Sequence, residues 1–214
     1  MHSIQKFDIY IFDCDGVILD SNELKIEAMK NALLAHFSII PEVDLCIDYF
    51  RNNFGKSRFH HINHFLNNIL NVEQQQRDRY EKLLLADFSK QCRKLYLNAE
   101  ITPGFLNFLK LCEGKRYVAS GSEQEELRNV FIAKRLDKYF DGIFGSPTPK
   151  VELIRHILNK EKNMNAVMFG DAESDMVSAC QNDIEFVFYS RYSNVKDKML
   201  KLCALNKFAI IDNF

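Results

Sequence analysis

Short apolar runs alternate with helical segments along the second half of the chain, and this alternation limits the possible folds most. The expected strands are Tyr117–Ala119, Ile143–Phe144, Ala166–Phe169, Glu185–Tyr189 and Phe208–Ile211. The expected helices are Pro103–Cys112, Glu125–Lys134, Val151–Glu161, Ser174–Gln181 and Val195–Leu205. Strands and helices that take turns along a chain form a parallel sheet covered by helices. The sequence therefore predicts an α/β fold with a doubly wound, Rossmann-like parallel sheet.

Another apolar strand lies near the N-terminus, over residues 7–12, and it ends in two acids and a glycine. Side chains alternate between the two faces of a strand, so Asp13 and Asp15 project to one side while Cys14 points away. Gly16 allows the backbone to turn sharply just beyond them. Like charges this close destabilise a fold unless a cation or a shared proton relieves them. The pattern indicates a divalent cation site, although an Asp- and Gly-rich turn gives the same residues.

A long region between these two parts has helical periodicity and few strand signals. We expect residues 21–95 to form an all-helical domain inserted after the first strand, with Asp20 capping its first helix. Residues 1–20 and 96–214 would then form the Rossmann-like core.

The composition is that of an ordinary globular protein, with 27% charged residues and a formal net charge of −1. It indicates neither a nucleic acid nor a membrane as a partner, and we expect a monomer or a weak homodimer. The first strand begins too close to Met1 for a signal peptide to precede it. The six cysteines are scattered without a C-x-x-C pair, which favours reduced thiols and a cytoplasmic protein.

In a doubly wound sheet, ligands bind beyond the carboxyl ends of the strands. Polar residues follow four of the expected strands: Asp13 and Asp15, Ser120 and Gly121, Lys150, and Asp171 and Asp175. Carboxylates can bind magnesium, and a serine hydroxyl, backbone amides and a lysine can bind an anion. Together these groups are typical of a site for a phosphate and a magnesium ion. Each group also has a structural interpretation. Ser120 and Gly121 could form a helix cap, Lys150 could lie in solvent, and the later acids could cap a helix.

These motifs, in this order, resemble the four motifs of the haloacid dehalogenase-like (HAD) hydrolase superfamily. The resemblance implies that Asp13 is a nucleophile that forms an aspartyl-phosphate and that Asp15 is the general acid and base. It implies Mg²⁺ as the cofactor, bound by Asp13, Asp15 and Asp171, with the backbone carbonyl of Asp15 contributing. Asp175 would order the outer shell of the metal.

The resemblance also implies that Ser120, Gly121 and Lys150 bind the phosphate. The inserted helices resemble the cap that many members of the superfamily place between their first two motifs. In its loop, Lys56 and Arg58 would contact a second anionic or polyhydroxylated group of the substrate. The alternative for these two basic residues is that they begin a helix on a solvent-exposed face. The nearby His60, His61 and His64 are expected to be surface residues rather than zinc ligands.

The resemblance implies a magnesium-dependent phosphatase that hydrolyses a small phosphomonoester, such as a sugar phosphate or a similar metabolite. The main alternative is a phosphomutase of the β-phosphoglucomutase type, which uses the same residues but returns the phosphoryl group to its substrate. A non-catalytic binding module on the same scaffold is less favoured, because every expected acid is present. A dehalogenase is also less favoured, since that type lacks the second aspartate and the metal.

Overall fold

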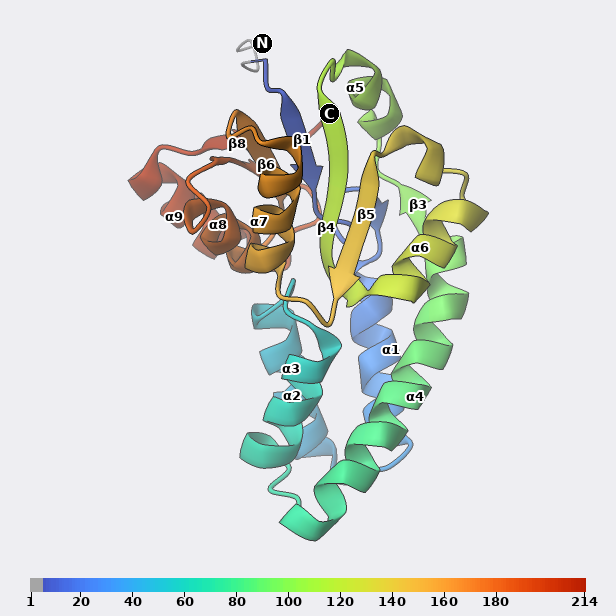
Figure 1. The fold of residues 1–214 in the computed structure, drawn as a ribbon. Helices are drawn as coiled ribbons and strands as arrows, with labels where there is room; N and C mark the ends of the chain where they lie inside the picture. The colour runs from blue at the N-terminus through green and yellow to red at the C-terminus, as the bar shows by residue number, and fades with distance from the viewer. Residues whose placement is uncertain (1–5) are drawn as a thin grey trace.

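A parallel sheet of six strands forms the centre of the protein in the computed structural model, which describes residues 6–214 (Figure 1). The strand order is β5-β4-β1-β6-β7-β8. The strands are β1 Ile9–Phe12, β4 Lys115–Glu123, β5 Gly142–Ser146, β6 Ala166–Gly170, β7 Glu185–Tyr189 and β8 Ala209–Ile211. Every strand expected from the sequence is present, so the predicted doubly wound α/β fold is confirmed.

Helices cover both faces of the sheet and make a three-layer structure. They are α5 Phe105–Leu111, α6 Gln124–Ala133, α7 Lys150–Glu161, α8 Glu173–Cys180 and α9 Lys196–Asn206, with a 3₁₀ turn at Asp137–Tyr139. Neighbouring strand residues point to opposite faces. Phe12 packs with the residues of α5 and α6, whereas Ile11 packs with those of α7, α8 and α9. The central strand is therefore buried on both sides, as expected for a parallel sheet.

The register of the sheet brings the ends of three strands together. Phe12 of β1 is aligned with Val118 of β4 on one side and with Phe169 of β6 on the other. Residues that follow these positions leave the sheet at the same edge. The acids after β1 and β6 and the serine near the end of β4 are thus neighbours in space.

The remaining helices pack together beyond the carboxyl ends of the strands (Figure 1). They are α1 Asn22–Leu34, α2 Ile40–Asn52, α3 Arg58–His64, the π-helix Phe65–Ile69 and α4 Gln74–Asn98. We call residues 22–98 the helical region. Among the helices of residues 6–214, none has the length and apolar character that crossing a bilayer requires.

The chain enters and leaves the helical region at adjacent points. There β2 (Leu19–Asp20) pairs antiparallel with β3 (Glu100–Ile101). This short ladder was not predicted, because two residues carry no periodic signal. Asp20 is an exposed residue of β2, and Ser21 occupies the N-cap position of α1, so the expected capping by Asp20 is wrong.

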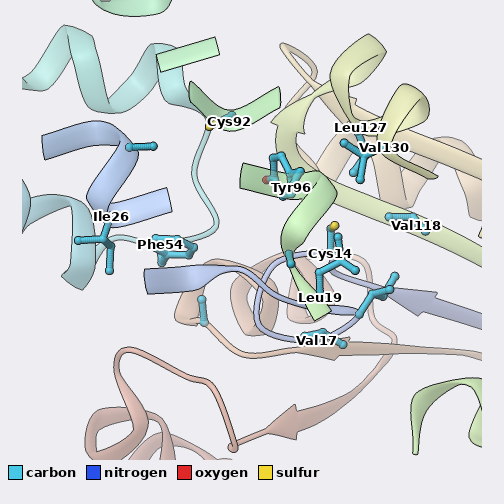
Figure 2. Packing of buried hydrophobic residues seen from close by; sticks show 14 of the residues in the cluster. Cys14, Val17, Leu19, Ile26, Phe54, Cys92, Tyr96, Val118, Leu127 and Val130 are labelled. Carbon is cyan, nitrogen blue, oxygen red and sulfur yellow. The ribbon is translucent and has the colours of Figure 1, made fainter. Parts of the chain in front are cut away.

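One hydrophobic cluster continues from the sheet into the helical region. Figure 2 shows part of it, from Val118 of β4 and Leu127 of α6 to Ile26 and Phe54 in the helical region. Cys14 is fully buried in this cluster, which confirms its predicted packing role. All six cysteines are free in the described chain. The shared cluster holds the helical region against the edge of the sheet.

Candidate active site

Three buried aspartates meet where β1 and β6 end. Asp13 follows β1, Asp171 follows β6, and Asp175 lies in the first turn of α8. One carboxylate oxygen from each lies within 4.8 Å of those of the other two. Gly16 makes this approach possible, because it has a φ of +74° and a Cβ there would lie 2.3 Å from Asp171 Oδ2.

Lys150 is the cation inside this group of acids. It is the first residue of α7, and its Nζ lies 3.1 Å from Asp13 Oδ2 and also contacts Asp175 Oδ1. Burial lowers the pKa of Lys150, but its attraction to Asp13 and Asp175 outweighs this and raises the pKa. Lys150 is only 7% exposed, so the interpretation as a solvated lysine is wrong.

Burial and mutual repulsion disfavour the charged forms of two of these acids. Burial raises the pKa of Asp13 to about 7, against the attraction of Lys150. Burial, Asp175 and Asp13 together raise the pKa of Asp171 well above its usual value. A bound cation would relieve this repulsion directly.

The hydrogen bonds distinguish the three acids. Asp175 Oδ2 accepts from the backbone N–H groups of Asp171 and Ala172, each at 3.1 Å, and its Oδ1 contacts Lys150. Asp171 Oδ2 accepts from Asn22 Nδ2 at 2.7 Å, whereas Asp171 Oδ1 is buried and has no partner within residues 6–214. Asp13 and Asp171 fit a hard divalent cation such as Mg²⁺, and Asp175 is placed to orient the turn that carries Asp171.

Asp15 has a different environment, because its carboxylate is not one of the clustered groups. Its Oδ1 accepts from Ser21 Oγ at 2.6 Å and from Tyr96 OH at 2.7 Å. Its Oδ2 accepts from Lys25 Nζ at 2.8 Å and from Ser122 Oγ at 2.9 Å. Burial raises the pKa of Asp15, but Lys25 and the hydrogen bonds more than compensate and lower it. The carboxylate is therefore held ionised by four donors.

Four residues near these acids were missed by the sequence analysis: Ser21, Asn22, Lys25 and Tyr96. Ser21 directly precedes the helical region, Asn22 and Lys25 lie in its first helix, and Tyr96 lies near its end. In a single sequence, nothing distinguishes a polar helix residue that contacts the site from an ordinary surface residue. Ser21 does not cap α1 with its side chain, and its hydroxyl binds Asp15 instead.

Ser120 and Gly121 lie inside β4, before the helix that follows. Ser120 is buried and its Oγ accepts from the N–H of Ser122 at 3.1 Å. Glu123 caps α6 by accepting from the N–H groups of the first turn, so Ser120 is not the helix cap. At Gly121 an added Cβ would lie 2.5 Å from the carbonyl oxygen of Gly55. The loop of the helical region thus closely approaches the strand at this point.

The two basic residues of that loop have different surroundings. Lys56 is exposed, and its ammonium donates to Asn53 Oδ1 at 3.0 Å. Arg58 is 4% exposed and forms a two-pronged ion pair with Glu126 of α6, at 3.1 and 2.6 Å. Its Nη1 also donates to Ser89 Oγ at 2.5 Å. The alternative that Arg58 starts a solvent-exposed helix face is wrong, because the side chain is buried.

The three histidines of α3 also differ from one another. His60 is exposed as expected. His61 is 1% exposed, with its ring centroid 4.6 Å from that of Phe50, so its expected surface position is wrong. His64 stacks on Tyr49 at 3.7 Å. These contacts make His61 a residue of the hydrophobic core.

The sequence and the fold were compared with known proteins. The model of the haloacid dehalogenase-like hydrolase family matches residues 7–181. The chain belongs to this family. The predicted recognition is confirmed, and membership of the HAD-like hydrolases makes the protein an enzyme, as predicted. None of the curated proteins compared with the chain matches it.

Solved structures of other HAD-like proteins share the fold. A predicted phosphatase from Clostridium acetobutylicum has a TM-score of 0.73 at 17% identity, covering 98% of this chain and 95% of that one. A haloacid dehalogenase-like hydrolase from Bacteroides fragilis has a TM-score of 0.77 at 16% identity, covering 98% of each chain. The β-phosphoglucomutase from Clostridium difficile has a TM-score of 0.69 at 19% identity, covering 97% and 91%. At these identities the likeness concerns the fold alone.

Proposed function

We propose that this HAD-like hydrolase is a magnesium-dependent phosphatase that hydrolyses a small phosphomonoester, such as a sugar phosphate, through an aspartyl-phosphate. One observation carries the proposal. The buried carboxylate of Asp13 lies at the end of the central strand, 3.1 Å from Lys150 and grouped with Asp171 and Asp175. A nucleophile beside a buried cation and a candidate metal site meets the requirements of phosphoryl transfer.

In the first step Asp13 attacks phosphorus, the bond from phosphorus to the ester oxygen breaks, and Asp15 protonates the departing alcohol. In the second step water attacks the aspartyl-phosphate, Asp15 takes the proton of the water, and the bond to Asp13 breaks. The observed hydrogen bonds hold Asp15 as a carboxylate, the state that the second step needs. For the first step Asp15 must gain a proton and exchange some of these contacts.

The phosphate would be bound by the Ser120 hydroxyl, the Gly121 N–H and the Lys150 ammonium, of which the ammonium lies 3.1 Å from Asp13 Oδ2. Mg²⁺ would be held by Asp13, Asp171 and the backbone carbonyl of Asp15, and when bound it neutralises charge on the transferred phosphoryl group. Asp175 would keep Lys150 and the Asp171 turn in position. The assignments of Asp13, Lys150, Asp171 and Asp175 rest on the contacts around the three acids, and those of Ser120, Gly121 and the Asp15 carbonyl follow from the resemblance to the family.

The helical region would act as a cap that excludes water during the reaction. In support of this, its loop contacts the core, since Ser174 Oγ donates to the carbonyl oxygen of Phe54 at 3.1 Å. We propose residues 21–95 as the cap domain, and residues 1–20 and 96–214 as the catalytic core. The free cysteines are compatible with the proposed cytoplasmic location.

The alternative of a phosphomutase is not favoured. One similar structure is a β-phosphoglucomutase, but the family model that matches the chain describes a hydrolase. The alternative of a non-catalytic binding module is disfavoured by the same match.

The test is a colorimetric assay with p-nitrophenyl phosphate, in excess Mg²⁺ and in EDTA. We expect hydrolysis that depends on magnesium and that Asp13→Asn abolishes. Stoichiometric release of inorganic phosphate separates a phosphatase from a mutase. Activity of the wild-type protein no higher than that of Asp13→Asn, over a panel of phosphate esters, would refute the proposal.

A further inference from the structure

A small cavity lies between the loop of the helical region and β4. Its volume is about 10 Å³, and its walls include Lys25, Gly121 and Ser122. Both Lys25 and Ser122 donate to the carboxylate of Asp15, the proposed acid for the departing alcohol. Gly121 belongs to the proposed phosphate site. The leaving group of a bound ester would therefore point toward this cavity.

The rest of the cavity wall is aromatic. Phe50, Phe54 and Phe88 contribute to it together with the ring of His61. Burial lowers the pKa of His61 well below its usual value, so the ring is neutral at neutral pH. The volume accommodates about one water molecule, so a leaving group enters only when the loop and the strand move apart.

Each buried cation of the wall already has an anionic partner. Arg58 forms its two-pronged ion pair with Glu126, and both side chains are nearly fully buried. Its guanidinium also lies 4.9 Å from the centre of the Phe88 ring. Lys25 is paired with Asp15 at 2.8 Å. Lys56 also lines the cavity but is exposed, and Asn53 accepts from its ammonium.

A second anionic group on the substrate would meet an unfavourable environment here. To bind Arg58 it would have to displace Glu126, whose buried carboxylate would then lose its two hydrogen bonds to Arg58 and keep only the more distant Arg93 Nε, at 3.9 Å. If the ion pair stayed intact, Glu126 would repel the incoming anion and the phenylalanine rings would not solvate it. An uncharged leaving group has neither penalty. Arg58 was expected to contact a second anionic or polyhydroxylated group of the substrate, and its pairing with Glu126 disfavours the anionic one.

We infer that the Arg58–Glu126 ion pair makes the enzyme selective for phosphomonoesters whose leaving group is uncharged, and that Glu126 excludes substrates with a carboxylate or a second phosphate. The inference rests on the proposed phosphatase function and names the substrate class of the same site. Arg58 and Glu126 are specificity residues in this account, without a direct part in the bond-breaking steps.

The test compares two esters of equal size that differ only in charge: 2-phosphoglycolate and its amide, 2-amino-2-oxoethyl phosphate. We expect kcat/KM of the wild-type enzyme to be at least tenfold higher for the amide. Glu126→Gln keeps the shape of the side chain and removes its charge, which leaves Arg58 free to attract the carboxylate. In this variant we expect the preference for the amide to fall at least tenfold.

Glu125→Gln is the matched control, because Glu125 is the exposed neighbour of Glu126 in α6 and the same charge is removed. Its preference should equal that of the wild-type enzyme. The inference is overturned if the wild-type enzyme hydrolyses 2-phosphoglycolate as well as the amide or better. This comparison needs no variant, so it holds even where Glu126→Gln fails to fold.

Binding gives a second readout that does not require turnover. Calorimetric titration of Asp13→Asn with each ester should show tighter binding of the amide, and tighter binding of 2-phosphoglycolate would contradict the inference. If no phosphate ester is hydrolysed above the Asp13→Asn background, the proposed function fails. The relative affinities would still decide whether the cavity discriminates against charge, so the two failures are distinguishable.

Discussion

Replacing the proposed nucleophile should stabilise the metal-free protein while it abolishes activity. Burial raises the pKa of Asp13 from 3.8 to about 7. Between these pH values the folded protein keeps a proton that the unfolded chain has lost, so stability falls as the pH rises through this window. A difference of about three pKa units corresponds to at most about 4 kcal/mol. The uncharged amide of Asp13→Asn avoids this cost.

We expect a net gain of roughly 2 kcal/mol at pH 8, since the amide loses part of the attraction to Lys150. In a chain of this length, such a gain raises Tm by about 4–8 °C. Thermal unfolding of both proteins in EDTA, at pH 4.5 and pH 8, measures the effect. The two Tm values should be similar at pH 4.5 and should diverge at pH 8.

Magnesium should reverse the order of stability. Mg²⁺ at one hundred times its Kd would stabilise the wild-type protein by about 2.7 kcal/mol and the variant by less. Asp48→Asn, at an exposed position of α2, is the control and should show no such dependence on pH or metal. If Asp13→Asn is less stable than the wild-type protein at pH 8 in EDTA, the account of this site is wrong.

Three other variants test the surroundings of the site. Lys25→Met removes the ion pair that helps to lower the pKa of Asp15. The limb of the pH–rate profile that is assigned to Asp15 should therefore move up by about one pH unit. An unchanged profile would argue against that assignment. Tyr96→Phe removes one of the four donors to Asp15 and should cost about 1 kcal/mol in urea unfolding, whereas no loss would mean that water replaces the hydroxyl. Gly121→Ala places a Cβ 2.5 Å from the Gly55 carbonyl oxygen and should lower kcat/KM at least tenfold with unchanged circular dichroism. Full activity of that variant would show that the loop need not approach the strand closely.

The fold was predictable because most of its strands contain a short apolar run, and these runs alternate with helices along the chain. Asp13 and Asp171 were identifiable for the same reason, since each directly follows one of these runs, and Lys150 lies in the loop and helix start that come soon after another. A parallel sheet aligns the ends of its strands, so their positions in the chain were enough to place them together. The short ladder of β2 and β3 has no comparable pattern.

Contacts made by single residues of the helical region could not be predicted. Arg58 and Glu126 are 68 positions apart, and nothing in either segment indicates that they meet. Lys25 and Tyr96 lie on different helices and converge on Asp15 only after the helical region has packed on the core. The burial of His61 likewise follows from tertiary packing, because its position beside two other histidines in α3 resembles that of a surface residue.

The antiparallel pairing of Leu19–Asp20 with Glu100–Ile101 has an evolutionary consequence. This pairing holds the two ends of the segment between β2 and β3 next to each other. A different segment inserted there need only have ends that lie equally close together. Descendants could exchange this whole module for one of another size without shifting the alignment of the strands that bear the reactive carboxylates. Selection for new substrates would then change the inserted segment, while the reactive residues of the core kept their positions.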